Sequence, residues 1–268
     1  MEIFGITSIA NLWETLVLIL ISFMVGLLGG FVGLALGTIR LPFFFLFGFP
    51  VPVSAGTNII ISTLSAATGS IRNVREGRID WRIVIIMGIP TIIGAFAGSF
   101  FSTLIHESLL IGLAGILVFW QGIEFLFRSK MFELTNESTS RSFTFYKAAT
   151  GAGIGAAIGL YGGAVGLIAG SIRLPAIIRI LGLNPRIASG TNLFIGFLLG
   201  TFGFAGHGVR GEIDIPLVIF LGIAAMIGSF IGAKFTGKVK LNLLLSSIGV
   251  VFIVVGALLL VNAFYRFN

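Results

Sequence analysis

The sequence predicts an all-α polytopic membrane protein with about eight hydrophobic segments in two tandem repeats of four. Three observations predict this fold class. Hydrophobic residues make up 56% of the 268 residues, and the mean hydropathy is +1.10. Charged residues make up only 10%, whereas a soluble domain carries about 25%. The charges also fall between long uncharged runs, so lipid is expected to surround most of the chain.

The uncharged runs mark the expected membrane segments, because a helix needs about 20 apolar residues to span a bilayer. They cover residues 15–39, 41–71, 83–105, 109–123, 148–172, 187–206, 215–233 and 241–265. The acidic start of the chain, followed by no small-residue cleavage site, argues against a cleaved signal peptide.

The run 41–71 is too long for one helix, since 31 residues would cover about 46 Å against a hydrocarbon core of about 30 Å. Pro50 and Pro52 interrupt it. We predict a short leg over 41–49 and a new helix from about Val51. The second half repeats the pattern, with a leg over 174–181 and a helix that opens at 184–185, where Asn precedes Pro. Broken or re-entrant helices are therefore expected in both halves.

An internal repeat divides the chain into residues 1–133 and 134–268, which together form one membrane domain. Residues 29–42 and 162–175 agree at ten of fourteen positions. Three further blocks match in register: a Gly-Thr-Asn triplet, a Gly-x-Ile-Asp turn and a Gly-xxx-Gly pair, which begin at Gly56, Gly77 and Gly94 in the first half and at Gly190, Gly211 and Gly228 in the second. Repeats with interrupted segments at equivalent places are typical of transporters, whose site lies at the repeat interface.

The distribution of basic residues favours an inverted arrangement of the two repeats. Three clusters stand out: Arg72, Arg75, Arg78 and Arg82; Arg128, Lys130, Arg141 and Lys147; and Lys234, Lys238 and Lys240. If the broken segments are re-entrant hairpins, each repeat crosses three times, the repeats are inverted and all three clusters are cytoplasmic. Four crossings per repeat would give parallel repeats and place the last cluster outside. The positive-inside rule favours the inverted layout, with both termini periplasmic.

The order of these motifs resembles the sulfite exporter TauE/SafE family of membrane transporters. It comprises a glycine-rich helix end, a Leu-Pro leg, a helix with Pro-x-x-Ala-x-Gly-Thr as at 185–191, the loop 75–81 with Arg-x-Gly-Arg-Ile-Asp-Trp, and a helix with spaced glycines. The resemblance implies a transporter for sulfite, a sulfonate, sulfoacetate or a similar oxyanion in the cell inner membrane. The family usually has an apolar residue where this chain has Arg40 and Arg173, and Ser where it has Asn58 and Asn192.

The residues themselves also point to an anion. Arg40 and Arg173 lie between apolar runs, after glycines that let backbone N–H groups approach a ligand. We expect the two arginines to form a pair that recognises one anionic group, with hydroxyl and amide donors from the next helices. The candidate substrate-binding residues are Arg40, Arg173, Gly29, Gly30, Gly33, Gly162, Gly163, Gly166, Ser54, Thr57, Asn58, Ser189, Thr191 and Asn192. The alternative is that the glycines only allow close helix packing and the arginines reach toward lipid headgroups.

Several functions are excluded by what the sequence lacks. It has no cysteine and only two histidines, His106 and His207, so a multi-histidine or thiolate metal site is not expected. It carries no Walker loop or nucleophile elbow and no carboxylate in the middle of a span, so neither an enzyme, a cofactor nor a carboxylate proton relay is predicted. No nucleic-acid partner is predicted. An anion channel or uniporter for another small anion or carboxylate, a non-transporting scaffold and a homodimer stay open as alternatives.

Overall fold

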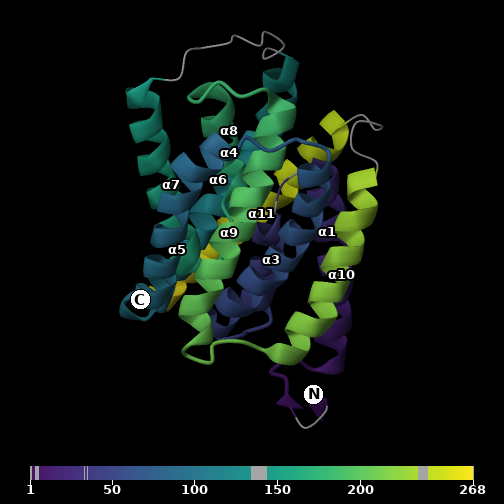
Figure 1. Ribbon diagram of the computed structural model, residues 1–268. Helices are drawn as coiled ribbons and strands as arrows, with labels where there is room; N and C mark the ends of the chain where they lie inside the picture. Colours follow the sequence, from purple (N-terminus) through teal and green to yellow (C-terminus); the bar gives the residue numbers. More distant parts are fainter. Residues whose placement is uncertain are drawn as a thin grey trace.

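The computed structural model describes residues 2–3, 6–32, 34, 36–133, 144–234 and 241–267, which form a bundle of long helices (Figure 1). Near the N-terminus two short strands, β1 (Glu2–Ile3) and β2 (Ile6–Thr7), pair antiparallel. All other regular structure in this part of the chain is helical. It consists of α1 (Leu12–Val32), η1 (Gly37–Ile39), α2 (Arg40–Leu46), α3 (Val51–Arg75), α4 (Trp81–Ile83), η2 (Val84–Gly88), α5 (Ile89–Phe101), η3 (Ser102–Leu104), α6 (Glu107–Glu133), α7 (Phe145–Val165), α8 (Gly170–Arg179), α9 (Pro185–Gly208), α10 (Ile215–Lys234) and α11 (Leu241–Phe267).

Six stretches of this helical structure are long and apolar enough to cross a membrane. They are Leu12–Gly30, Trp81–Leu104, Glu107–Leu126, Phe145–Val165, Ile187–Gly208 and Ile215–Gly232. The outer surface is apolar as well; for example, Ile93 is 65% exposed and Leu20 is 58% exposed. The prediction of an all-α, multi-pass membrane protein is confirmed at this level. The two predicted segments without such a span correspond to α3 and α11.

The centre of the bundle is an antiparallel pair of equivalent helices, α3 and α9. The backbone N–H of Asp214, beyond the end of α9, donates to the hydroxyl of Thr57 near the start of α3 at 2.9 Å. In return, the N–H of Asp80 donates to the hydroxyl of Thr191 near the start of α9 at 2.9 Å. Each Gly-Thr-Asn block is thus fastened to the Gly-x-Ile-Asp turn of the other half.

The glycine-rich helices of one half pack on the other half. A Cβ at Gly26 or Gly30 of α1 would overlap the backbone of α10, at Ala225 and Ser229. The equivalent glycines of α7, Gly159 and Gly163, meet the backbone of α5 in the same way, at Thr91 and Ala95. The two halves therefore share one core and do not form separate bodies.

The interrupted segments confirm the predicted breaks but not the predicted hairpins. The helix after the first break begins at Val51 and the helix after the second break begins at Pro185, as expected from the prolines. However, α3 has 25 residues and α9 has 24, so each is about 36 Å long and has the length to cross a bilayer, although only α9 is also among the apolar spans. Both α3 and α9 were expected to be return legs of re-entrant hairpins, but each is a full-length helix. Only α2, with η1, and α8 are short.

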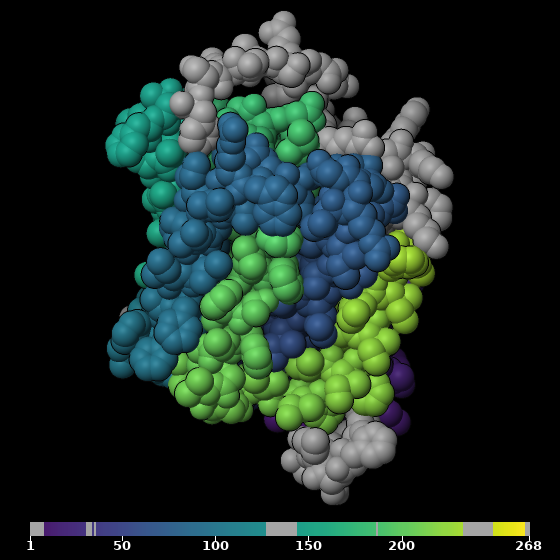
Figure 2. Space-filling view, viewed as in Figure 1, coloured from purple at the N-terminus to yellow at the C-terminus, as the bar shows by residue number. Residues whose placement is uncertain are grey.

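The two ends of the bundle carry different features (Figure 1). Both ends of the chain lie in the lower half of the view, whereas the last turns of α3, α6 and α10 lie toward the top. These helix ends flank the three basic clusters of the sequence. The turn between α9 and α10, which contains Glu212 and Asp214, lies at the bottom. Figure 2, from the same side, shows α9 and part of α3 reaching the surface between α5 and α10.

Candidate functional site

Arg40 lies at the start of α2 and is 1% exposed. Its Nε donates to Ser22 Oγ of α1 at 2.7 Å. Its Nη1 donates to Asn58 Oδ1 of α3 at 3.0 Å and to Ser62 Oγ at 3.5 Å. A Cβ at Gly37 would overlap the Ser62 hydroxyl, so a glycine here leaves space for the residues that hydrogen-bond Arg40. Arg40 thus ties the short helix to α1 and α3.

Arg173 occupies the equivalent position in α8 and is fully buried, at 0% exposure. Its Nε donates to Asn192 Oδ1 at 2.7 Å, and its Nη2 donates to the backbone carbonyl of Asn192 at 2.9 Å. Its Nη1 is buried and has no acceptor among the described residues. In each repeat the predicted arginine is therefore hydrogen-bonded directly to the predicted asparagine.

The two arginines lie in separate shells, where a shell is the set of residues that hydrogen-bond one arginine. Ile59 of α3 lies beside Gly203 of α9, and Leu193 of α9 lies beside Gly69 of α3. In this register Asn58 and Asn192 are about 18 Å apart along the helix axes, at 1.5 Å per residue. In this register each arginine is bonded to its own asparagine, and the sharing of one anion by both arginines stays a prediction.

Both guanidinium groups are held by neutral partners. The partners found for them in the described part of the chain are hydroxyl, amide and carbonyl groups, and none is a carboxylate. A buried charge is costly unless it is paired, and an oxyanion is the natural complement of a guanidinium fork. Nearby in sequence, Thr38, Ser54 and Ser171 have buried hydroxyls without a partner among the residues that the structure describes. Among the described residues, both guanidinium groups therefore lack the opposite charge that would compensate them. No three His, Cys, Asp or Glu side chains gather into a metal site in the described regions.

The predicted glycines mostly serve helix packing. Gly30 and Gly163 contact the opposite half, and Gly29 and Gly162 each face the carbonyl of the chain segment that follows their own helix. Gly166 caps α7 with φ of 75°, a conformation that favours glycine. Gly33 lies outside the described residues.

Gly166 also connects the two halves, because its carbonyl accepts a hydrogen bond from Asn58 Nδ2 at 2.9 Å. The corresponding Nδ2 of Asn192 donates within its own half, to the Gly170 carbonyl at 3.0 Å. Both asparagines thus orient their Oδ1 toward an arginine by donating from Nδ2 to a backbone carbonyl.

The predicted hydroxyl residues divide into two roles. Thr57 and Thr191 accept the reciprocal backbone bonds described above and are buried, so their role is structural. Ser54 is buried, and its hydroxyl has no partner in the described part of the structure. Ser189 is half-buried. Ser22 and Ser62 were missed by the sequence analysis. The signal that could have found them is that both are polar where the other repeat has glycine.

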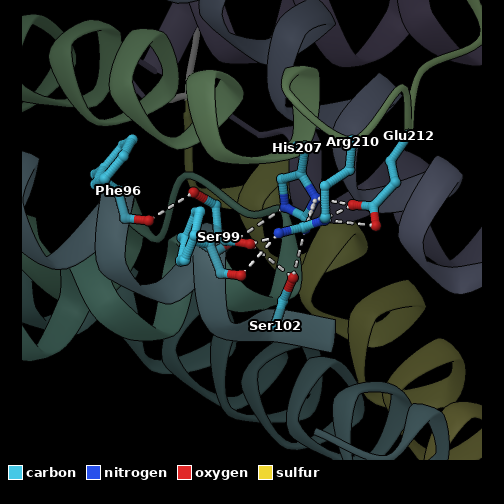
Figure 3. Close-up of polar contacts among 8 residues, drawn as sticks. Phe96, Ser99, Ser102, His207, Arg210 and Glu212 are labelled. Carbon is cyan, nitrogen blue, oxygen red and sulfur yellow. Dashed lines mark hydrogen bonds and ion pairs between the residues drawn. The ribbon is translucent and has the colours of Figure 1, made fainter. Parts of the chain in front are cut away.

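Figure 3 shows a second polar cluster, formed by His207, Arg210 and Glu212, at the turn between α9 and α10 that lies at the bottom of Figure 1. Arg210 binds both Glu212 oxygens, at 2.7 and 2.6 Å. His207 is 1% exposed; its Nε2 donates to the Gly163 carbonyl at 3.1 Å and its Nδ1 faces Glu212 at 2.8 Å. Burial alone would raise the pKa of Glu212, but hydrogen bonds from His207 and Arg210 outweigh it and lower that pKa to about 2.

This cluster also fastens two helices together. Arg210 donates to the carbonyls of Ser99 and Phe100 at the end of α5, at 2.8 Å each, and to Ser102 Oγ at 2.9 Å. The turn after α9 is therefore fixed to α5 directly, and through His207 to the end of α7. From the sequence, His207 was considered only as one of two histidines, and this cluster was not predicted.

Comparison with known proteins places the chain among membrane transporters. A family model described as sulfite exporter TauE/SafE matches residues 18–259. The probable membrane transporter protein YdhB of Bacillus subtilis is 26% identical over 246 residues, which cover 91% of this chain and all of the relative. YunE of the same organism is 21% identical over 93% of this chain and 98% of the relative. MJ0441 of Methanocaldococcus jannaschii, also described as a probable membrane transporter protein, is 24% identical over 86% of this chain and 91% of the relative. No solved structure matches the chain.

Proposed function

Because the chain belongs to the sulfite exporter TauE/SafE family of membrane transporters, we propose that it is a secondary transporter for a small sulfur-containing oxyanion in the cell inner membrane. The substrate class is sulfite, a sulfonate, sulfoacetate or a similar ion. The observation that carries the proposal is the presence of two fully buried guanidinium groups whose known partners are all neutral.

The physical reason is charge compensation. Placing a guanidinium among buried helices costs several kcal/mol unless an opposite charge is near. A sulfur oxyanion carries a negative charge and several acceptor oxygens, which match the flat fork of Arg donors. When such an ion enters from water, it recovers part of that cost. Neutral solutes would leave the charge uncompensated, so the arginines favour anions over them.

We also propose that the repeats are inverted and that the upper end of the bundle in Figure 1 faces the cytoplasm. The antiparallel course of α3 and α9, with its reciprocal Thr57–Asp214 and Thr191–Asp80 bonds, supports an inverted relation. The basic clusters flank the upper helix ends, which supports a cytoplasmic upper side. Both termini are then periplasmic. Labelling of a cysteine introduced at Lys238 from outside the cell would contradict this orientation.

The direction we propose is efflux driven by the membrane potential. An inside-negative potential favours the exit of an anion by about 2.3 kcal/mol per charge per 100 mV. Flux in liposomes should then follow an imposed potential. Flux that ignored the potential but followed a pH gradient would contradict this mechanism and point to proton coupling.

The direct test is exchange in liposomes. Purified protein loaded with labelled sulfite on one side should exchange it saturably for unlabelled sulfite, and a thermal-shift screen should rank sulfite, thiosulfate, sulfate, sulfoacetate and taurine against carboxylates. Replacement of both Arg40 and Arg173 by Lys should abolish the exchange, because Lys keeps the charge but loses the fork. Single-channel currents in place of saturable exchange would identify an anion channel. Absence of both would overturn the proposal.

A further inference from the structure

We propose that the two arginine shells have diverged, so that Arg173 binds the transported anion while Arg40 has become a structural arginine. This inference rests on the proposed function and assigns its site to the second half of the chain. The observation that carries it is a difference at equivalent positions: Arg40 has serine acceptors at two places where the shell of Arg173 has glycines.

Arg40 is supplied with acceptors from two neighbouring helices. Ser22 of α1 accepts from Nε, and Asn58 and Ser62 of α3 accept from Nη1. In the second half, the repeat offset places Gly155 where the first half has Ser22, and Gly196 where it has Ser62. The two hydroxyl acceptors that fix Arg40 are therefore both missing around Arg173.

Arg173 is consequently left with hydrogen-bonding capacity that the described residues do not fill. Its Nε and Nη2 are both taken up by Asn192, whereas its Nη1 is buried without an acceptor in the described structure. An unsatisfied donor on a charged group costs more than a neutral one when buried. An oxyanion would supply both the missing acceptor and the missing negative charge.

Gly155 and Gly196 differ in what an added side chain would contact. A Cβ at Gly155 would lie 2.5 Å from the backbone carbonyl oxygen of Met87, so close helix packing already requires glycine there. A Cβ at Gly196 would meet only side-chain atoms, at 2.9 Å from Ile168 Cγ2 and 3.2 Å from Arg173 Nη2. Backbone packing does not require a glycine at 196. In this conformation Ile168 and the guanidinium of Arg173 close around the place where a side chain at 196 would lie.

The anion reaches Nη1 in a different conformation, because Nη1 is covered in this one. The segment 166–169 between α7 and α8 contains Ile168, which packs against Gly196, and it has no helical hydrogen-bond ladder of its own. Movement of this segment would uncover Arg173, and it would break the hydrogen bond from Asn58 of α3 to the Gly166 carbonyl. A binding residue that is closed off in one state is what alternating access requires.

The experiment compares matched variants of the two shells in purified full-length protein, with sulfite as the probe and its Kd measured by titration calorimetry. Arg173→Lys should weaken sulfite binding at least ten-fold and clearly more than Arg40→Lys does, whereas Arg40→Lys should lower the thermal unfolding temperature more. Gly196→Ser, which restores the acceptor of the other half, should also weaken binding at least ten-fold. Gly196→Ala, which adds only the Cβ, should stay within three-fold. Ser62→Gly, which keeps Arg40 itself, should leave the Kd unchanged even if Arg40→Lys does not fold.

The outcomes separate this inference from the proposed function. Equal losses for Arg40→Lys and Arg173→Lys, or a loss in Ser62→Gly, would overturn the division of roles but leave anion transport standing. Equal losses in Gly196→Ser and Gly196→Ala would overturn the acceptor argument. If the unmodified protein neither bound nor exchanged sulfite or the other sulfur oxyanions, both proposals would fail together.

Discussion

Two equivalent turns at opposite ends of the bundle carry one ion pair in reversed order. In the turn after α3, Glu76 pairs with Arg78, and in the turn after α9, Arg210 pairs with Glu212. The two arginine side chains are equally exposed, at 21% each. Both turns also fasten a backbone N–H to a threonine of the other half. The two repeats therefore share the turn and its hydrogen bond to the opposite repeat.

The turns differ in what else they hold. Arg210 reaches the end of α5, and His207 joins the turn to the Gly163 carbonyl of α7. The residue equivalent to His207 is Asn73, which instead donates to the Gly69 carbonyl of its own helix at 3.0 Å. Both turns thus keep the bonds between the halves. The lower turn alone has the cluster of His207, Arg210 and Glu212, called the clasp below, which joins α9 to α5 and α7.

Removal of the clasp should have the largest effect. Arg210→Gln loses the bonds to the Ser99 and Phe100 carbonyls and leaves Glu212 with His207 alone. We expect the free energy of unfolding, measured by SDS titration in mixed micelles, to fall by about 2–3 kcal/mol. The matched control is Arg78→Gln, which changes an arginine of the same exposure and should cost less than about 1 kcal/mol. Equal costs would show that the two turns are fastened equally.

The hydrogen bond from each turn to a threonine of the other half should contribute equally to the free energy of unfolding in both halves. Thr57→Val and Thr191→Val each remove the acceptor of a backbone N–H while keeping the side-chain shape. Each change should lower the free energy of unfolding by about 1–2 kcal/mol, and the two values should agree closely. Thr68→Val is the control, because its hydroxyl bonds only within α3, to the Leu64 carbonyl at 3.0 Å. A large cost at one threonine alone would mean that the halves are not equivalent here.

The helix starts could be predicted from the sequence, because proline acts locally. Pro50 and Pro52 placed the start of α3 at Val51, and Pro185 placed the start of α9. The full length of α3 was not predicted. The prolines and the positive-inside rule favoured a re-entrant hairpin, whereas the structure has one helix, α3, that buries Asn58 and Ser62 around Arg40. A polar helix in the centre of a bundle cannot be told from a re-entrant segment by hydropathy alone.

The candidate site was predicted in part for a similar reason. The repeat identified Arg40 and Arg173 and their asparagines, since duplicated polar residues are visible without a structure. The serine acceptors were missed because Ser22 belongs to a different helix from Arg40 and only packing brings the two together. The pairing of both arginines on one anion was expected from symmetry about a common axis. The offset of Asn58 and Asn192 along α3 and α9 depends on helix register, which the sequence does not reveal.

The smallest effect we predict is the pH dependence of the clasp. The hydrogen bonds of Glu212 lower its pKa from 4.5 to about 2, so between these values the unfolded chain holds more protons on this group than the folded one. Acidification through this window therefore favours unfolding, and the stabilisation by Glu212 is fully present only above about pH 5.

Glu212→Gln removes the titrating group and keeps its size. The difference in thermal unfolding temperature between the unmodified protein and this variant should be constant from pH 8 to pH 5. It should then shrink steadily toward pH 3. The exposed Glu107, changed to Gln, controls for the general loss of a negative charge. If the difference for Glu212→Gln grew on acidification, or matched that of Glu107→Gln at every pH, the clasp would not depend on an ionised Glu212, and the two ends of the bundle would differ in packing alone.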